Sequence, residues 1–148
     1  MGINKDYLGR TFPATSPYEV SRVKIAEFAE AIGDPNPVFR DRAAAQAAGY
    51  PDVIAPPTFP VVIATAASGR AVADPGLGIN YAMVVHGEQR FEYSRPLRAG
   101  DVVTAQSTIS GIREVGSMTM LTTETHIRTV AGEHVCTGFG TLVERGAA

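Results

Sequence analysis

Cysteine is nearly absent from this chain of 148 residues, tryptophan is missing, and neither sign of charge prevails. The lone cysteine, Cys136, cannot close a disulfide within the chain, which excludes a disulfide-built secreted scaffold and indicates a reduced, cytoplasmic compartment. A formal net charge of -2 gives no basic field for nucleic acid or for anionic lipid. We therefore expect no nucleic-acid partner and no membrane partner.

A long apolar run is also missing. The longest, from Phe59 to Ala67, has about half of the ~20 residues that cross a bilayer, and Pro60 and Thr65 interrupt it. The histidines and the cysteine show no metal-ligand spacing, and no glycine-rich phosphate loop follows a strand. We expect no metal and no cofactor, and one domain spanning residues 1–148, which is long enough to bury a core unaided.

Three helices are expected in the first half of the chain. Apolar residues at helical spacing predict an amphipathic helix over 21–32, with Ser21 as its N-cap. Asp41 can cap a second, short helix over 43–48, so that 34–40 forms the loop between the two. Segment 58–73 is rich in alanine and apolar on nearly every face, which predicts a helix enclosed by other structure.

Strands are expected in the second half. Stretches rich in valine, threonine and isoleucine, joined by short glycine-containing turns, predict antiparallel strands over 84–93, 102–113, 118–129 and 134–143. Segment 18–20 can add an edge strand. Helices that come early and strands that come late favour an α+β fold, with the helices packed on one face of an antiparallel sheet.

The loop at 33–41 reads Gly33-Asp34-Pro35-Asn36-Pro37-Val38-Phe39-Arg40-Asp41. It resembles the G-D-x-N-P-[LIV]-H signature of MaoC-like (R)-specific enoyl-thioester hydratases and 3-hydroxyacyl dehydratases. The resemblance implies a hot-dog fold, in which the sheet curls around the long central helix, and makes Asp34 the retained catalytic residue. In this family the Asp and a His hold one water molecule, but Phe39 stands where that His is expected. On spacing alone, without the resemblance, Asp34 is better interpreted as a loop carboxylate that accepts backbone N–H groups.

A second departure lies before the central helix. Related hydratases usually carry a His-Gly pair there, whose glycine N–H polarises the thioester carbonyl, whereas this chain has Pro56-Pro57-Thr58. Proline has no N–H, so we expect the amide of Thr58 to take over that carbonyl. The resemblance thus implies a substrate-binding set: Asn36, Phe39, Pro57, Thr58 and Phe59.

His86 is the histidine that we expect to replace the missing one as a catalytic group. It precedes a strand that should flank the central helix, whereas His126 and His134 are expected to face solvent. The alternative is an ordinary histidine hydrogen-bonded at the end of a strand. A set of arginines, Arg90, Arg95 and Arg98, could approach the phosphates of coenzyme A or of a carrier protein.

The resemblance covers most of the chain, including the APPTF and HGEQRFEYSRPLRAGD stretches. It is closest to accessory subunits of the actinobacterial (3R)-hydroxyacyl-ACP dehydratase, which also lack the His and pair with a catalytic MaoC-like subunit. That implies an acyl-binding dehydratase subunit, acting on acyl-CoA or acyl-ACP thioesters in fatty-acid metabolism. Two alternatives stay open: a self-sufficient homodimeric hydratase that uses Asp34, and a non-catalytic acyl-thioester or small-lipid binding protein. Each predicts at least a dimer.

Overall fold

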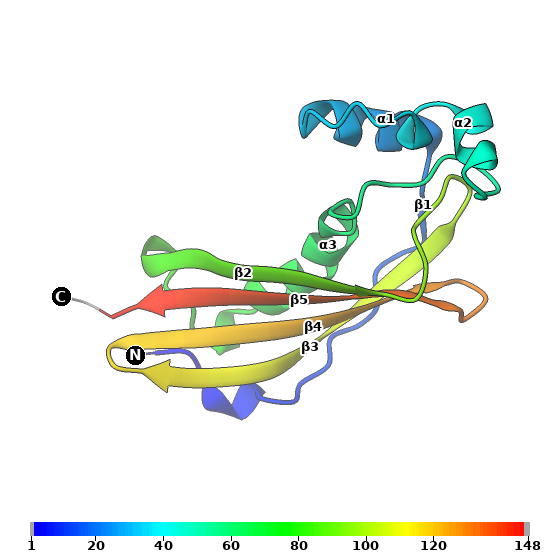
Figure 1. Ribbon diagram of the computed structural model, residues 1–148. Coiled ribbons are helices and arrows are strands. Elements are labelled where there is room, and N and C mark those ends of the chain that lie inside the picture. Colours follow the sequence, from blue (N-terminus) through cyan, green and yellow to red (C-terminus); the bar gives the residue numbers. More distant parts are fainter. Residues whose placement is uncertain (1, 147–148) are drawn as a thin grey trace.

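A five-stranded antiparallel sheet forms the main layer of the protein, in the order β1-β3-β4-β5-β2 (Figure 1). The computed structural model describes residues 2–146, so residues 1, 147 and 148 of the predicted domain lie outside the described part. The strands are β1 (Tyr18–Glu19), β2 (Val84–Tyr93), β3 (Val102–Val115), β4 (Met118–Thr129) and β5 (His134–Arg145). All the predicted strands are confirmed; β3 and β5 each run two residues further than predicted.

The helices also lie where they were predicted: α1 (Arg22–Ala31), α2 (Arg42–Ala47) and α3 (Val61–Val72). Ser21 caps α1 by accepting a hydrogen bond from the Lys24 N–H at 3.1 Å, and Asp41 caps α2 by accepting from the Ala43 N–H at 2.8 Å. Four 3₁₀ turns fill the connections, at Lys5–Tyr7, Pro37–Phe39, Pro75–Leu77 and Tyr81–Met83. In Figure 1, α1 and α2 lie above one end of the sheet, and α3 begins between them and the strands and then runs behind the sheet.

The central helix differs from its prediction in two respects. It begins after Pro60 rather than at Thr58, with no side-chain cap. It is also not enclosed on every side: Ile63, Ala67 and Ala71 are buried, but Thr65 and Ala66 on another face are exposed. Alanine occurs at both buried and exposed helix positions, so the number of apolar residues could not show which face of α3 is exposed to solvent.

Close packing between α3 and the sheet depends on glycine in β5. A Cβ atom at Gly138 would lie 3.2 Å from the Phe91 ring and 3.5 Å from the Cβ of Ala64. The absence of that side chain lets the curved sheet approach the helix. The main core cluster on this side joins all three helices to the sheet through residues such as Ile25, Phe59 and Ile127.

The two edges of the sheet differ greatly in length. One is the two-residue strand β1, and the other is the ten-residue strand β2, most of which is exposed. A bulge at Gly87 interrupts the pairing of β2 with β5, because His86 pairs with Leu142 and Glu88 with Thr141. No helix in the described residues is long and apolar enough to span a bilayer.

Candidate functional site

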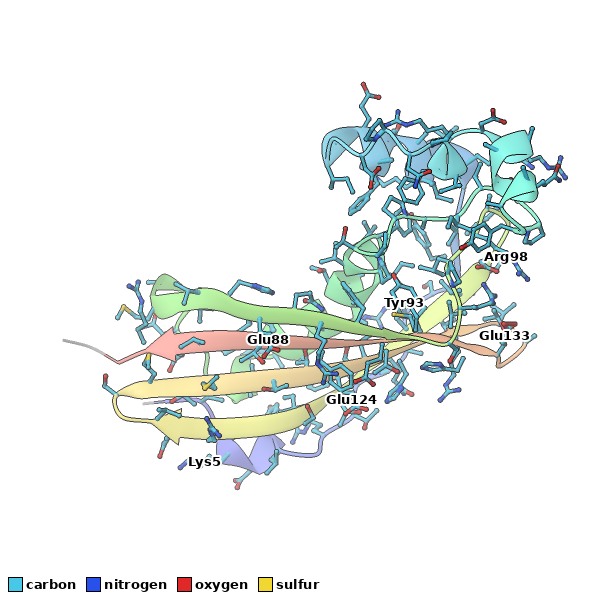
Figure 2. The ribbon with its side chains drawn as sticks, viewed as in Figure 1. Lys5, Glu88, Tyr93, Arg98, Glu124 and Glu133 are labelled. Carbon is cyan, nitrogen blue, oxygen red and sulfur yellow. The ribbon has the colours of Figure 1, made fainter. Side chains whose placement is uncertain are left out.

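A pocket of about 520 Å³ lies where the loop after α1, the segment before α3 and the end of β2 meet. Figure 2 shows Tyr93, which ends β2, on the side of the sheet toward the helices. The lining consists mostly of apolar side chains: Asn36, Val38, Phe39, Ala48, Tyr50, Ile54, Ala55, Pro57, Tyr93 and Pro96. The structure thus brings together three of the predicted binding residues, from two separate motifs.

Two successive turns shape the loop that presents Phe39. The Asp34 carboxylate accepts a hydrogen bond from the Asn36 N–H at 3.0 Å, and the Asn36 amide oxygen accepts from the Val38 N–H at 3.1 Å. The Arg40 guanidinium donates to the Asp34 carbonyl at 2.8 Å. Asp34 is half-buried and does not line the pocket, whereas Phe39 does and is only 5% exposed. Asp34 therefore fulfils the loop-shaping role that its residue type allows; its catalytic role stays a prediction.

The pocket walls contain no carboxylate and no imidazole. Their polar side chains are those of Asn36, Tyr50 and Tyr93. The Tyr93 hydroxyl donates to the Pro57 carbonyl at 2.5 Å, and burial raises the pKa of the Tyr93 phenol. A phenol that stays protonated can donate a hydrogen bond but cannot accept a proton. Within the described chain, the pocket can hold an apolar ligand but has no acid–base pair.

The segment before α3 supplies one backbone donor. Among residues 2–146, none accepts a hydrogen bond from the Thr58 N–H, while its carbonyl accepts from the Val61 N–H at 3.1 Å. The neighbouring Pro57 has no N–H to offer. Phe59 does not line the pocket; it is fully buried and packs edge-to-face on Phe28, with ring centroids 5.3 Å apart. Thr58 is exposed and does not line the pocket either, so its role as donor stays a prediction, and Phe59 supports the segment from the core.

His86 lies at the opposite end of β2 from the pocket. It lines a separate groove of about 270 Å³ beside α3, together with Thr65, Ser68 and Gln89. Tyr93 lies seven positions after His86, which at ~3.3 Å per residue places the two roughly 20 Å apart. Within one chain, His86 cannot act on a ligand in the pocket that Phe39 lines.

The other two histidines belong to a hydrogen-bonded network. Ser94 and His134 Nδ1 lie 2.6 Å apart, His134 Nε2 lies 2.7 Å from the Thr137 hydroxyl, and that hydroxyl lies 3.2 Å from His126 Nδ1. Burial, followed by the charge of Arg128, lowers the pKa of His134. Both residues are half-buried rather than fully solvent-facing as predicted, and their ring nitrogens lie within hydrogen-bonding distance of serine and threonine hydroxyls.

Carboxylates already engage the candidate phosphate-binding arginines. Arg95 bonds the carboxylate of Asp101 at 2.8 and 3.0 Å and also pairs with Glu133. Arg90 pairs with Glu92. Arg98 lies 3.9 Å from the Asp101 carboxylate. All three arginines thus have a carboxylate nearby, which leaves little free positive charge for a phosphate.

Sequence reasoning did not place Tyr50 and Tyr93 in the site. Tyr93 ends a predicted strand, and nothing in its sequence neighbourhood indicates that its hydroxyl meets Pro57. That contact joins residues 36 positions apart and depends on where the end of β2 meets the segment before α3.

Comparison with known proteins agrees with this geometry. Residues 6–138 match the family model described as "FAS1-like, dehydratase domain region". The UPF0336 protein of Thermobifida fusca is 57% identical over 148 residues, which cover 100% of this chain and 97% of that protein.

Two solved structures are similar in fold and above 25% in sequence identity. One is the C-terminally truncated HadBC (3R-hydroxyacyl-ACP dehydratase) complex from Mycobacterium tuberculosis, with a TM-score of 0.81 and 26% identity over 94% of this chain and 98% of that one. The other is a MaoC-like dehydratase, with a TM-score of 0.84 and 31% sequence identity. The match covers 95% of this chain but only 43% of that longer chain. The predicted hot-dog fold is confirmed, and the chain belongs to the MaoC-like dehydratase family, in its FAS1-like dehydratase region.

Proposed function

We propose that this protein binds the acyl group of an enoyl or 3-hydroxyacyl thioester in the Phe39 pocket, as one subunit of a hydratase or dehydratase. The observation that carries this proposal is the pocket lining, which is apolar and contains no carboxylate or imidazole. Its volume of about 520 Å³ lies within the range of small-molecule sites. The groups that move protons come from a second subunit.

The reaction explains why a second subunit is needed. In hydration, a base activates water for attack on C3 while an acid protonates C2, and dehydration reverses these steps. Phe39 cannot accept or donate a proton, and the Tyr93 phenol stays protonated. This chain contributes the apolar walls that exclude water and orient the acyl chain, and the Thr58 N–H, which donates to the thioester carbonyl.

The first candidate for the second subunit is a MaoC-like protein with an intact Asp and His. The similarity to HadBC supports it, since that 26% identical structure is of a complex. The second candidate is another copy of this chain. The exposed edge strand β2 supports it, because an unpaired strand edge can pair with another strand. The thioester carrier is coenzyme A or an acyl carrier protein.

Calorimetric titration with crotonyl-CoA and dodecenoyl-CoA tests the pocket. Ala48→Phe should fill it and weaken binding by tenfold or more, whereas Ala47→Phe, a neighbouring exposed position outside the lining, should leave binding unchanged. Equal binding by both variants, or no binding by the wild-type chain, would contradict the proposal. Loss of enoyl absorbance, followed with and without an added MaoC-like protein, then identifies the source of the acid–base pair.

A further inference from the structure

Five side chains form one continuous series of hydrogen bonds where the end of β2, the start of β5 and strand β4 meet. Ser94 Oγ lies 2.6 Å from Nδ1 of His134, and Nε2 of the same ring lies 2.7 Å from Thr137 Oγ1. Thr137 Oγ1 lies 3.2 Å from Nδ1 of His126, whose Nε2 lies 3.0 Å from the Glu124 carboxylate. We call these five residues the histidine network.

The carboxylate at one end fixes which atoms donate while both imidazoles are neutral. Because an ionised carboxylate only accepts, Nε2 of His126 carries the hydrogen, and Nδ1 of His126 accepts from the Thr137 hydroxyl. The Thr137 oxygen then accepts from Nε2 of His134, and Nδ1 of His134 accepts from the Ser94 hydroxyl. Every donor in the network thus has an acceptor, and Ser94 is held against the start of β5.

The network can take up one proton but not two. With one ring protonated, the Thr137 hydroxyl still donates to the neutral ring. With both protonated, each ring directs an N–H at the Thr137 oxygen, and the hydroxyl hydrogen has no acceptor left in the network. Thr137 is only 6% exposed, so the loss of that hydrogen bond is costly. The ring centroids lie 6.2 Å apart, so the two positive charges also repel each other.

Three strands and one turn supply the other groups around the two rings. Two of these groups are carboxylates that arginines already engage: Glu92 of β2 pairs with Arg90, and Glu133 in the turn before β5 pairs with Arg95. Strand β3 contributes the uncharged Gln106 opposite His126. On β4, beside Glu124, the remaining charged group is Arg128.

Arg128 opposes protonation of the second ring. It lies opposite His134 in the pairing of β4 with β5 and has no salt bridge among residues 2–146. Burial, and then the charge of Arg128, lower the pKa of His134. Because the folded-state pKa is depressed, the stability that the neutral ring contributes is fully present above the unfolded pKa of about 6.5 and decreases as the pH falls below it.

The network ends beside the pocket. Ser94 directly follows Tyr93, whose hydroxyl donates to the Pro57 carbonyl, and the Ser94 N–H donates to the Val135 carbonyl at 2.9 Å. We propose that the histidine network is a proton-sensitive latch on the Phe39 pocket. It holds the end of β2 while at most one imidazole is protonated, and double protonation releases Ser94 and with it Tyr93, so that acyl ligands bind more weakly. The inference rests on the proposed function only for the ligand that the pocket holds.

Hydrogen exchange of the Ser94 amide tests the latch without any ligand. In the wild-type chain its protection factor should fall on the order of tenfold between about pH 7.5 and about pH 5. His126→Gln keeps a hydrogen-bonding side chain but cannot take up the second proton, so it should keep its protection at both pH values. A protection factor that stays constant in the wild-type chain, or falls equally in His126→Gln, would overturn the latch.

Two threonine variants separate the network from packing. Thr137→Val removes the hydroxyl that both rings share and should lower the protection of the Ser94 amide already at neutral pH. Thr122→Val is the matched control, because the Thr122 hydroxyl lies 3.2 Å from that of Thr141, outside the network. It should behave as the wild-type chain does. Equal protection in the two variants would contradict a role for the shared hydroxyl.

Calorimetric titration with dodecenoyl-CoA carries the test to the pocket. Between the same two pH values the affinity of the wild-type chain should fall on the order of tenfold more than that of His126→Gln. The comparison cancels the titration of the ligand itself. The same pH dependence in both chains would overturn the link from the latch to the pocket. If dodecenoyl-CoA does not bind at all, the proposed function fails, while the exchange of the Ser94 amide still decides whether the latch exists.

Discussion

Replacing Asp52 with asparagine should loosen the attachment of α1 and α2 to the rest of the molecule. The Asp52 carboxylate accepts two hydrogen bonds from the Arg22 guanidinium of α1, at 2.6 and 3.1 Å, and one from the Val53 N–H at 2.7 Å. Arg42 of α2 lies 3.7 Å away. One carboxylate therefore ties both helices that flank the Asp34 loop.

The expected loss of unfolding free energy follows from the lowered pKa of the Asp52 carboxyl. The hydrogen bonds from Arg22 come first among the causes that lower the pKa of Asp52 from 3.8 to about 2. At about 1.4 kcal/mol per pKa unit, that shift corresponds to roughly 2.5 kcal/mol. The Arg22 side chain is 59% exposed, so solvent screens the pair, and we expect about 1 kcal/mol.

Urea unfolding of the wild-type chain and of Asp52→Asn measures this difference. Because the folded-state pKa is depressed, the stabilisation is present above the unfolded pKa and is lost as the pH falls from about 4 toward 2. The two unfolding free energies should therefore differ at pH 7 and converge near pH 2. Asp6→Asn, an exposed carboxylate without a salt bridge among the described residues, is the control. Equal stability at pH 7, or a gap that persists at low pH, would refute the reasoning.

Three further changes test the pocket and the core. Tyr93→Phe removes the hydrogen bond to Pro57 and should weaken crotonyl-CoA binding by about 1 kcal/mol in calorimetry; unchanged affinity would show that the bond does not hold the pocket. Gly138→Ala should lower the unfolding free energy by about 1–3 kcal/mol, and adding Phe91→Leu should recover part of it; an unaffected single variant would contradict the tight packing. Asp34→Asn should leave acyl binding unchanged, since its oxygen can still accept the loop hydrogen bond, and weaker binding would place the carboxylate in the pocket.

The strands of the sheet could be predicted because their periodicity and turns are local signals. The position of β2 at the edge could not, because the order of strands depends on which non-local pairs form. The open face of α3 escaped prediction for a related reason. Thr65 and Ala66 are compatible with a buried or an exposed helix surface, and only the placement of the sheet decides between them.

For the site, the sequence singled out segments that meet in the structure but could not give every contact. Asn36, Phe39 and Pro57 lie in two motifs and line one pocket. Tyr93 reaches the same pocket through the end of β2, which no local pattern could reveal. His86 shows a different limit. It lies beside the central helix, as predicted, but at the end of β2 that is farther from the pocket.

The most direct test of the account is the rate of crotonyl-CoA hydration by the purified chain over a range of protein concentrations that spans dimer dissociation. The account predicts negligible turnover wherever the chain is monomeric, with activity appearing only when a second subunit pairs, whether another copy or an added MaoC-like protein. Turnover on the order of 10 s⁻¹ that is independent of concentration and persists in the monomer would contradict it.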